Sequence, residues 1–115
     1  MPETDLITLT DETLAGTLRG TAVPVVVDFW AQWCPPCGPM ARTLAELAPE
    51  FAGRLLIGKI NADENPESTR AYRVLSMPTL LVFTDGVVTA SIVGLRPKSV
   101  LRKALTDALA PYANV

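Results

Sequence analysis

Two cysteines, Cys34 and Cys37, are the residues whose type and spacing most directly indicate chemistry in this sequence. The 115-residue chain has no other cysteine, and two prolines separate the pair. At helical spacing, residues i and i+3 have Cα atoms about 5–6 Å apart, which is the separation that a disulfide prefers. A disulfide between the two cysteines can therefore form and break with little backbone movement. The predicted chemistry of the pair is thiol–disulfide exchange.

The absence of histidine narrows the other possibilities. Ser-His-Asp and Cys-His catalysis are excluded because both need an imidazole base. A structural zinc site usually takes four Cys or His ligands, and one copy of the chain offers two. Half of a metal site and two inert cysteines stay open as alternatives. We expect no bound metal and no cofactor other than a redox-active disulfide between Cys34 and Cys37.

A site without histidine must activate its thiol in another way. The cysteines lie where a buried strand at 23–30 gives way to a predicted helix at 34–51. The N-terminus of a helix presents free N–H groups and a partial positive charge, which favour a thiolate over a thiol. Cys34, nearer that end, is the predicted nucleophile, and Cys37 is the predicted resolving thiol.

Length and composition indicate one globular domain, residues 1–115, with 49% hydrophobic and 19% charged residues. A net charge of −2 gives no attraction to nucleic acid or to anionic membranes. The acidic first residues do not resemble a signal peptide, and no apolar run is long enough to span a membrane. We expect a cytoplasmic protein, in which a close cysteine pair is catalytic or metal-binding rather than structural.

Hydrophobic periodicity predicts alternating strands and helices. The order β-α-β-α-β-α-β-β-α predicts an α/β fold, with a mixed sheet that ends in an antiparallel hairpin and with helices on both faces. The predicted strands are 6–9, 23–30, 55–61, 79–84 and 87–93. The predicted helices are 10–20, 34–51, 65–72 and 97–110, the last with Val100, Leu101, Ala104, Leu105, Ala108 and Leu109 on one side.

Local signals set the expected ends of these helices. Thr10 is the predicted N-cap of the first helix, with Asp11 in its first turn, and Asn65 is the predicted N-cap of the third. Pro39 is expected to kink the second helix, and Pro49 to stop it early.

Residues 26–40, Val-Val-Asp-Phe-Trp-Ala-Gln-Trp-Cys-Pro-Pro-Cys-Gly-Pro-Met, resemble the active-site segment of thioredoxins. Residues 77–83 and the Asp85–Gly86 turn resemble the cis-proline loop and the hairpin of the same family. The likeness covers about residues 5–112. It implies the thioredoxin fold and dithiol reductant activity on protein disulfides. The implied partners are protein disulfide substrates and thioredoxin reductase, and we expect a monomer.

The resemblance gives roles to two charged residues in apolar strands. Burial raises the pKa of a carboxyl group, and the family implies that Asp28 accepts a proton from Cys37. The alternative is an edge carboxylate with a hydrogen bond or a cation. Lys59 matches the lysine that lies near this aspartate in the family; the alternative is a surface lysine whose stem lies along apolar surface.

Further matches imply a surface that binds substrate. Pro78 matches the proline that is cis and faces the cysteines, whereas the sequence alone favours a trans proline before the next strand. The family geometry leaves the backbone of Met77 free to pair with an extended substrate segment. Trp33 is expected to lie exposed beside the site. Gly94 matches a glycine that lets a partner chain approach in the family; the alternative is that it only marks the end of a strand.

The sequence departs from the family pattern around the cysteines. Pro35 and Pro36 replace the usual Gly-Pro at the expected docking surface, Gly38 replaces a basic residue, and Arg42 stands where the kinking proline usually lies. Pro35 removes one N–H group close to the nucleophile. Two alternatives to a general reductant therefore stay open. One is a thioredoxin-fold enzyme with an oxidant or single-target redox role, and the other is a non-catalytic binding module.

Overall fold

The computed structural model describes residues 6–109, which form five strands, four α-helices and one short 3-10 helix. Their order matches the predicted order. The elements are β1 (Ile7–Leu9), α1 (Leu14–Arg19), β2 (Val25–Trp30), α2 (Cys37–Leu47), the 3-10 helix η1 (Ala48–Phe51), β3 (Leu56–Asn61), α3 (Pro66–Ala71), β4 (Thr79–Thr84), β5 (Val87–Val93) and α4 (Lys98–Ala108).

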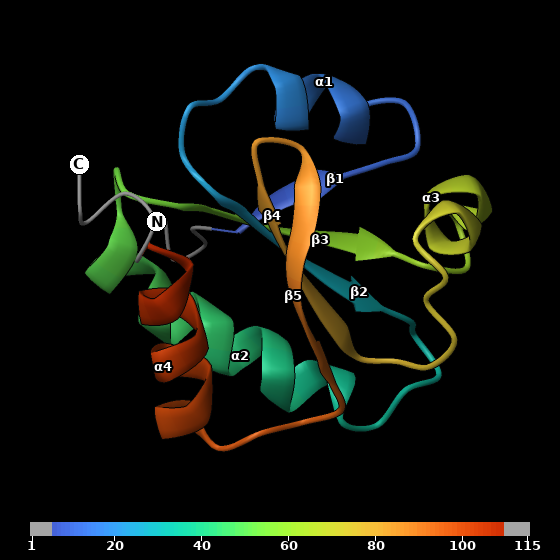
Figure 1. The fold of residues 1–115 in the computed structure, drawn as a ribbon. Helices are drawn as coiled ribbons and strands as arrows, with labels where there is room; N and C mark the ends of the chain where they lie inside the picture. Colours follow the sequence, from blue (N-terminus) through green and yellow to red (C-terminus); the bar gives the residue numbers. More distant parts are fainter. Residues whose placement is uncertain (1–5, 110–115) are drawn as a thin grey trace.

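The strands form one mixed sheet in the order β1-β3-β2-β4-β5 (Figure 1). The pairs β1–β3 and β3–β2 are parallel, and the pairs β2–β4 and β4–β5 are antiparallel. Asp85 and Gly86, both at positive φ, form the predicted tight turn between the last two strands. The predicted fold class is confirmed, with β2 at the centre of the sheet.

Helices cover both faces of the sheet, which explains why β2 is buried along nearly its whole length and is apolar except at Asp28. Alternate side chains of a strand point to opposite faces. Val26 packs in a core cluster with residues of α2 and α4, whereas Val27 and Phe29 pack in a second cluster with residues of α1. Asp28 follows the alternation of Val26 and therefore lies on the α2 face of the sheet.

The start of α2 differs from the prediction. The helix begins at Cys37 with Pro36 as N-cap, so Cys34 lies in the preceding turn rather than in the helix. Pro39 is then the third residue of the helix, where no N–H donor is needed, and the helix continues through it to Leu47. The predicted early end near Pro49 is confirmed, because η1 replaces the last turns.

The predicted N-cap was wrong at α1, whereas Asn65 takes the N-cap position of α3 as predicted. The α1 helix begins at Leu14, because Thr10 and Thr13 exchange backbone and side-chain hydrogen bonds in a turn before it. The side chain of Asn65 makes no capping bond; it donates to the carbonyl of Asn61 and accepts from the N–H of Asp11. The capping partner of α3 comes from elsewhere in the chain.

Asp11 is that partner. Its carboxylate accepts the N–H groups of Glu67 at 3.2 Å and of Ser68 at 2.8 Å, both in the first turn of α3. Desolvation opposes the effect, but the hydrogen bonds from Ser68 and Glu67 hold the pKa of Asp11 below its ordinary value. A side chain predicted to serve its own helix therefore joins two helices on the same face of the sheet.

Replacing Asp11 by alanine is expected to lower the free energy of unfolding, because two N–H groups in the first turn of α3 lose their acceptor. Urea unfolding at neutral pH measures the change. Glu12→Ala is the matched control, because Glu12 is the exposed acidic neighbour of Asp11. Equal losses in the two variants would contradict the capping role.

The buried apolar face of α4 is narrower than predicted. Leu101, Leu105 and Ala108 are buried, whereas Val100 is exposed because it lies at the edge of the apolar stripe. The predicted end at Ala110 lies outside the described residues. No helix within residues 6–109 is long and apolar enough to cross a membrane.

Candidate active site

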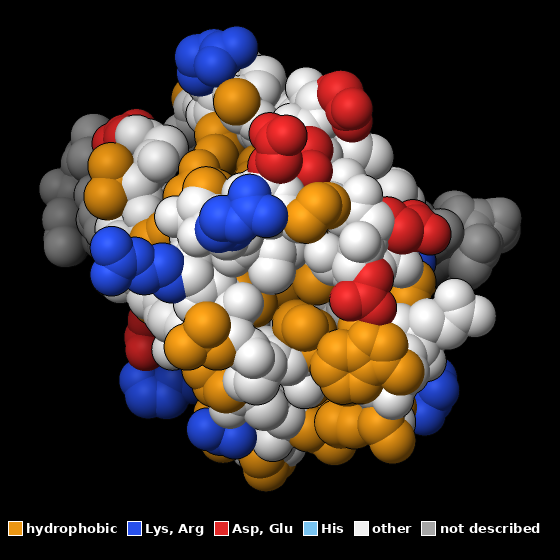
Figure 2. Space-filling model, turned by 90° about the vertical axis from the view of Figure 1, so that its right-hand side faces the viewer, with side chains coloured by type: hydrophobic (Ala, Val, Ile, Leu, Met, Phe, Trp, Pro, Cys, Tyr) orange, Lys and Arg blue, Asp and Glu red, His pale blue; other side chains and the backbone are white. Residues whose placement is uncertain are grey.

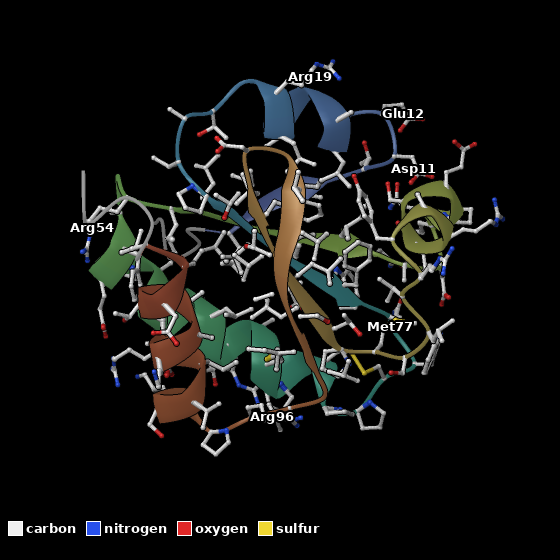
Figure 3. The ribbon with its side chains drawn as sticks, in the orientation of Figure 1. Asp11, Glu12, Arg19, Arg54, Met77 and Arg96 are labelled. Carbon is white, nitrogen blue, oxygen red and sulfur yellow. A yellow bond between two sulfur atoms is a disulfide. The ribbon has the colours of Figure 1, made fainter. Side chains whose placement is uncertain are left out.

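The structure joins Cys34 and Cys37 in a disulfide at the start of α2 (Figure 3). Their Cα atoms lie 5.4 Å apart, as the spacing predicts. The turn is held by two main-chain hydrogen bonds, from the N–H of Cys34 to Ala31 and from the N–H of Cys37 to Cys34, each 3.2 Å long. Both cysteine side chains are largely shielded from solvent.

Pro36 and Pro39 reduce the number of backbone N–H groups that the start of α2 can offer to the cysteine sulfurs. Pro36 and Pro39 have no N–H group, and the N–H of Cys37 already bonds to the carbonyl of Cys34. Of the four amide positions at this end, Gly38 is the one whose N–H has neither restriction. A thiolate at Cys34 therefore receives less main-chain stabilisation than a helix end without prolines would give it.

Asp28 is completely buried on the α2 face of the sheet. Neither carboxylate oxygen has a hydrogen-bond partner among the described residues. Desolvation raises the pKa of Asp28 from 3.8 to about 7, and the positive charge of Lys59 opposes the shift. A carboxyl group with this pKa exchanges protons near neutral pH. The structure contradicts the alternative of an edge carboxylate with a hydrogen bond.

Lys59 is the register partner of Asp28 in the parallel pair of β2 and β3. Its side chain is half-buried and lines a groove beside Cys34 and Cys37. Its charge acts on Asp28 without a salt bridge between the two side chains in the described structure. The strand pairing therefore brings both charged residues to the cysteine end of the sheet.

The loop before β4 lies against the cysteines. The peptide bond between Met77 and Pro78 is cis. Met77 packs on the cluster that contains Cys34 and Cys37, and Figure 3 shows it beside the disulfide. Gly94 donates its N–H to the carbonyl of Pro78 at 2.8 Å, which places it next to the same loop. Within residues 6–109, the main chain of Met77 makes no hydrogen bond.

Residues 5–107 match the family model described as Thioredoxin. The chain belongs to the thioredoxin family. It is 42% identical over 103 residues to a protein named thioredoxin from Alicyclobacillus acidocaldarius, a match that covers 90% of this chain and 97% of the relative. It is 43% identical over 101 residues to a thioredoxin from Mycobacterium tuberculosis, covering 88% of this chain and 87% of the relative.

Family membership and the cysteine geometry agree on the activity. The chain is a dithiol–disulfide oxidoreductase of the thioredoxin family, with the thioredoxin fold and protein-disulfide reductase activity. Among the described residues, no three His, Cys, Asp or Glu side chains gather into a group that could hold a metal ion.

Trp33 shows a contact of this thioredoxin-family site that sequence reasoning missed. Its side chain is 63% exposed, as expected, and its indole Nε1 donates to Oδ2 of Asp63 at 2.7 Å. The carboxyl ends of parallel strands meet at one edge of a sheet, so the residues after β2 and after β3 must be neighbours. That rule was the available signal for Asp63.

Exposed hydrophobic side chains gather on one face of the molecule. Figure 2 shows orange side chains gathered on the lower part of the face that carries α3, with acidic side chains above them. Large exposed apolar residues near the site include Trp33, Leu75 and Leu95. Leu75, two residues before Met77, is 93% exposed. Between the two cysteines, Pro35 is exposed and Pro36 is half-buried.

Proposed function

We propose that Cys34 is the nucleophile and Cys37 the resolving thiol of a general reductant for protein disulfides. The observation that carries this assignment is their placement, with Cys34 in the turn before α2 and Cys37 in the helix itself. The Cys34 thiolate attacks one sulfur of a substrate disulfide and releases the other as a thiol. Cys37 then attacks Cys34, which forms the Cys34–Cys37 disulfide and releases the reduced substrate with two electrons.

Asp28 is the proposed proton acceptor for Cys37. Cys37 must lose its proton before it attacks, since the thiolate is the nucleophile. The buried carboxyl lies on the face of the sheet that α2 covers, and its pKa of about 7 suits proton exchange at neutral pH. Lys59 is the proposed positioning residue, because its charge opposes the rise in the pKa of Asp28.

The unpaired main chain of Met77 is the proposed site for an extended substrate segment. An extended peptide gains affinity from main-chain hydrogen bonds and specificity from its side-chain contacts. Pro78 and Gly94 shape this edge, and their mutual hydrogen bond keeps the two loops together. Trp33, Pro35 and Pro36 are proposed to contact substrate around the disulfide.

The reaction as proposed needs no bound cofactor, because the cysteine pair itself carries both electrons. We expect thioredoxin reductase to supply these electrons. We also expect the protein to be cytoplasmic and monomeric. The assay is the reduction of insulin by NADPH, thioredoxin reductase and this chain, with Cys34→Ser as control. Turnover that depends on Cys34 supports the proposal. Reactivity with dithiothreitol but not with the reductase favours an oxidant or single-target role, and no reaction with either leaves the binding module.

Replacing Asp63 by alanine is expected to raise the KM for insulin about threefold to tenfold, since a charge-assisted hydrogen bond no longer orients the Trp33 indole. Steady-state reduction at several insulin concentrations measures this change. Reaction with dithiothreitol should stay unchanged, because a small thiol needs no docking surface. Glu64→Ala removes the neighbouring exposed charge and is the control. Equal KM values in the two variants would contradict a positioning role for Asp63.

A further inference from the structure

The two methionines of the described residues differ in their access to solvent. Met40 is completely buried in the core cluster that includes residues of α2 and α4, whereas Met77, in the loop before β4, is partly exposed. A thioether sulfur is oxidised to a sulfoxide when an oxidant can reach it. Met77 is therefore the methionine of residues 6–109 that a small oxidant reaches in the folded protein.

The side chain of Met77 lies at the junction of two core clusters. On one side it packs against the cluster of Ala31, Cys34 and Cys37, and Figure 3 shows it beside the disulfide. On the other side it packs against the cluster that contains Phe29. A change in the polarity of this one side chain therefore acts on the wall of the redox site and on the core behind it.

Oxidation of Met77 would change the chemistry of its contact with the disulfide. A sulfoxide is polar and carries a strong hydrogen-bond acceptor in place of a soft apolar sulfur. The side chain of Ala31 and the disulfide between Cys34 and Cys37 have no N–H or O–H group that could donate to it. Because an acceptor without a donor is unfavourable in an apolar contact, the new oxygen should turn toward solvent.

Met77 also belongs to the edge that is proposed to bind substrate. Its main chain makes no hydrogen bond within residues 6–109, and the side chain of Leu75, two residues earlier, is 93% exposed. An extended substrate segment must lie against this edge to bring its disulfide to Cys34. A sulfoxide oxygen on the edge would lose its bound water when the substrate docks, and this cost weakens docking.

The disulfide form of the protein leaves Met77 as the reactive sulfur beside the site. The sulfurs of Cys34 and Cys37 are bonded to each other, so neither is a thiolate that a peroxide could attack. The partly exposed thioether of Met77 can still take up an oxygen atom. A protein that has lost its supply of electrons is therefore open to this second oxidation.

We propose that Met77 is an oxidant-sensitive modification site and that its sulfoxide weakens the docking of protein substrates. The proposal rests on the proposed function, because it uses the substrate-binding edge at Met77. Hydrogen peroxide transfers one oxygen atom to the thioether sulfur; the S–O bond forms as the O–O bond breaks, and one molecule of water leaves. Methionine loses two electrons and the peroxide gains them. The change is reversible, because a sulfoxide can be reduced to the thioether.

Peptide mapping tests the site of oxidation. The full-length disulfide form is treated with hydrogen peroxide, the peroxide is removed with catalase, and the protein is reduced, alkylated and digested with trypsin. Cleavage after Arg42 and after Arg73 places Met40 and Met77 in different peptides. We expect oxygen to enter the Met77 peptide at least about tenfold faster than the Met40 peptide.

Insulin reduction measures the consequence for docking. Each treated protein is reduced with dithiothreitol and freed from the reagent, and its rate constant with insulin is divided by that of the untreated protein. This ratio should fall to about one tenth in wild type, the effect of one unsatisfied polar contact. It should not fall in Met77→Leu, which has no sulfur at this position but still contains Met1 and Met40. Met40→Leu is the matched control and should be as sensitive as wild type.

Two further measurements separate docking from the chemistry of the cysteines. The rate constant for reduction of the Cys34–Cys37 disulfide by dithiothreitol should change by less than about twofold after peroxide treatment, because a small thiol does not need the docking edge. Incubation with methionine sulfoxide reductases and dithiothreitol should restore insulin reduction. Failure to restore it would assign the loss to another lesion and contradict the proposal.

The proposal is overturned by equal oxidation of Met40 and Met77, or by a Met77 sulfoxide that reduces insulin as fast as the untreated protein. An equal loss of insulin reduction in Met77→Leu, or a parallel fall in the reaction with dithiothreitol, also overturns it. In each case normal insulin reduction by the untreated protein leaves the proposed function standing. Untreated wild-type protein that does not reduce insulin would overturn both proposals together.

Discussion

Replacing Asp28 by alanine is expected to stabilise the oxidised protein by about 3–4 kcal/mol above pH 8. The rise in the pKa of Asp28 from 3.8 to about 7 corresponds to about 4 kcal/mol of destabilisation when the carboxyl is ionised in the folded state. The loss of packing around a small side chain subtracts part of this gain. Few single substitutions stabilise a protein this much, because few buried charges have no partner.

The sign of the pH dependence follows from the raised pKa. Below pH 4 the carboxyl is protonated in both the folded and the unfolded chain, so it contributes no pH-dependent penalty. Between pH 4 and 7 the unfolded chain releases its proton first, and stability falls as the pH rises. Above pH 7 the full penalty is present. The gain in the alanine variant should therefore be large at pH 8.5 and absent at pH 3.5.

Urea unfolding across this pH range measures the effect, with Asp28→Asn as the control. Asparagine has nearly the same shape but cannot ionise, so both variants should lose the fall in stability between pH 4 and 7. If stability still falls between pH 4 and 7 in both variants as it does in wild type, the raised pKa of Asp28 is contradicted.

In kinetic experiments, Asp28→Ala should also slow the release of the mixed disulfide near neutral pH. An unchanged rate would contradict proton acceptance by Asp28.

Replacing Cys37 by serine is expected to trap the mixed disulfide between Cys34 and its substrate. A resolving thiol within the same turn has a very high effective concentration, and its loss should slow substrate release at least about 10³-fold. The trapped complex should form in a one-to-one ratio and dissociate only on addition of dithiothreitol. Non-reducing gel electrophoresis and mass spectrometry measure it directly.

Cys34→Ser is the paired variant that decides the roles. It should form no mixed disulfide, because the remaining thiol of Cys37 lies within α2, behind the turn that contains position 34. A stable complex with Cys34→Ser and none with Cys37→Ser would reverse the assignment of nucleophile and resolving thiol.

Local patterns predicted the element order because they depend on neighbours in the chain. The apolar run of β2 and the helical periodicity of residues 34–51 can each be recognised within one short segment. Met40, Leu44, Leu47 and Phe51, which recur at this periodicity, are all buried. The helix starts were harder to predict. Thr10 and Asn65 were suitable caps by residue type, yet Asp11 caps α3 from a distant part of the sequence. A capping residue more than fifty positions away in the chain cannot be recognised from the local sequence of the helix.

The site divides in the same way. The cysteine pair was visible from its spacing, and the family resemblance drew attention to Asp28 and Lys59. Their actual environment depends on the register of β2 with β3, which leaves the carboxylate buried beside a lysine that does not bond to it. Likewise, Asp63 reaches Trp33 only because two parallel strands end at the same edge.

The sequence by itself determined the chemistry available to this protein. A single pair of cysteines at helical spacing and the absence of histidine exclude histidine-dependent catalysis and favour thiol–disulfide exchange. Only the tertiary structure decided how that chemistry is tuned and reached. The buried carboxylate, the cis-proline loop and the groove lined by Lys59 and the two cysteines combine segments that are far apart in the chain. Desolvation and contact depend on which segments the sheet brings together, and that information is not local.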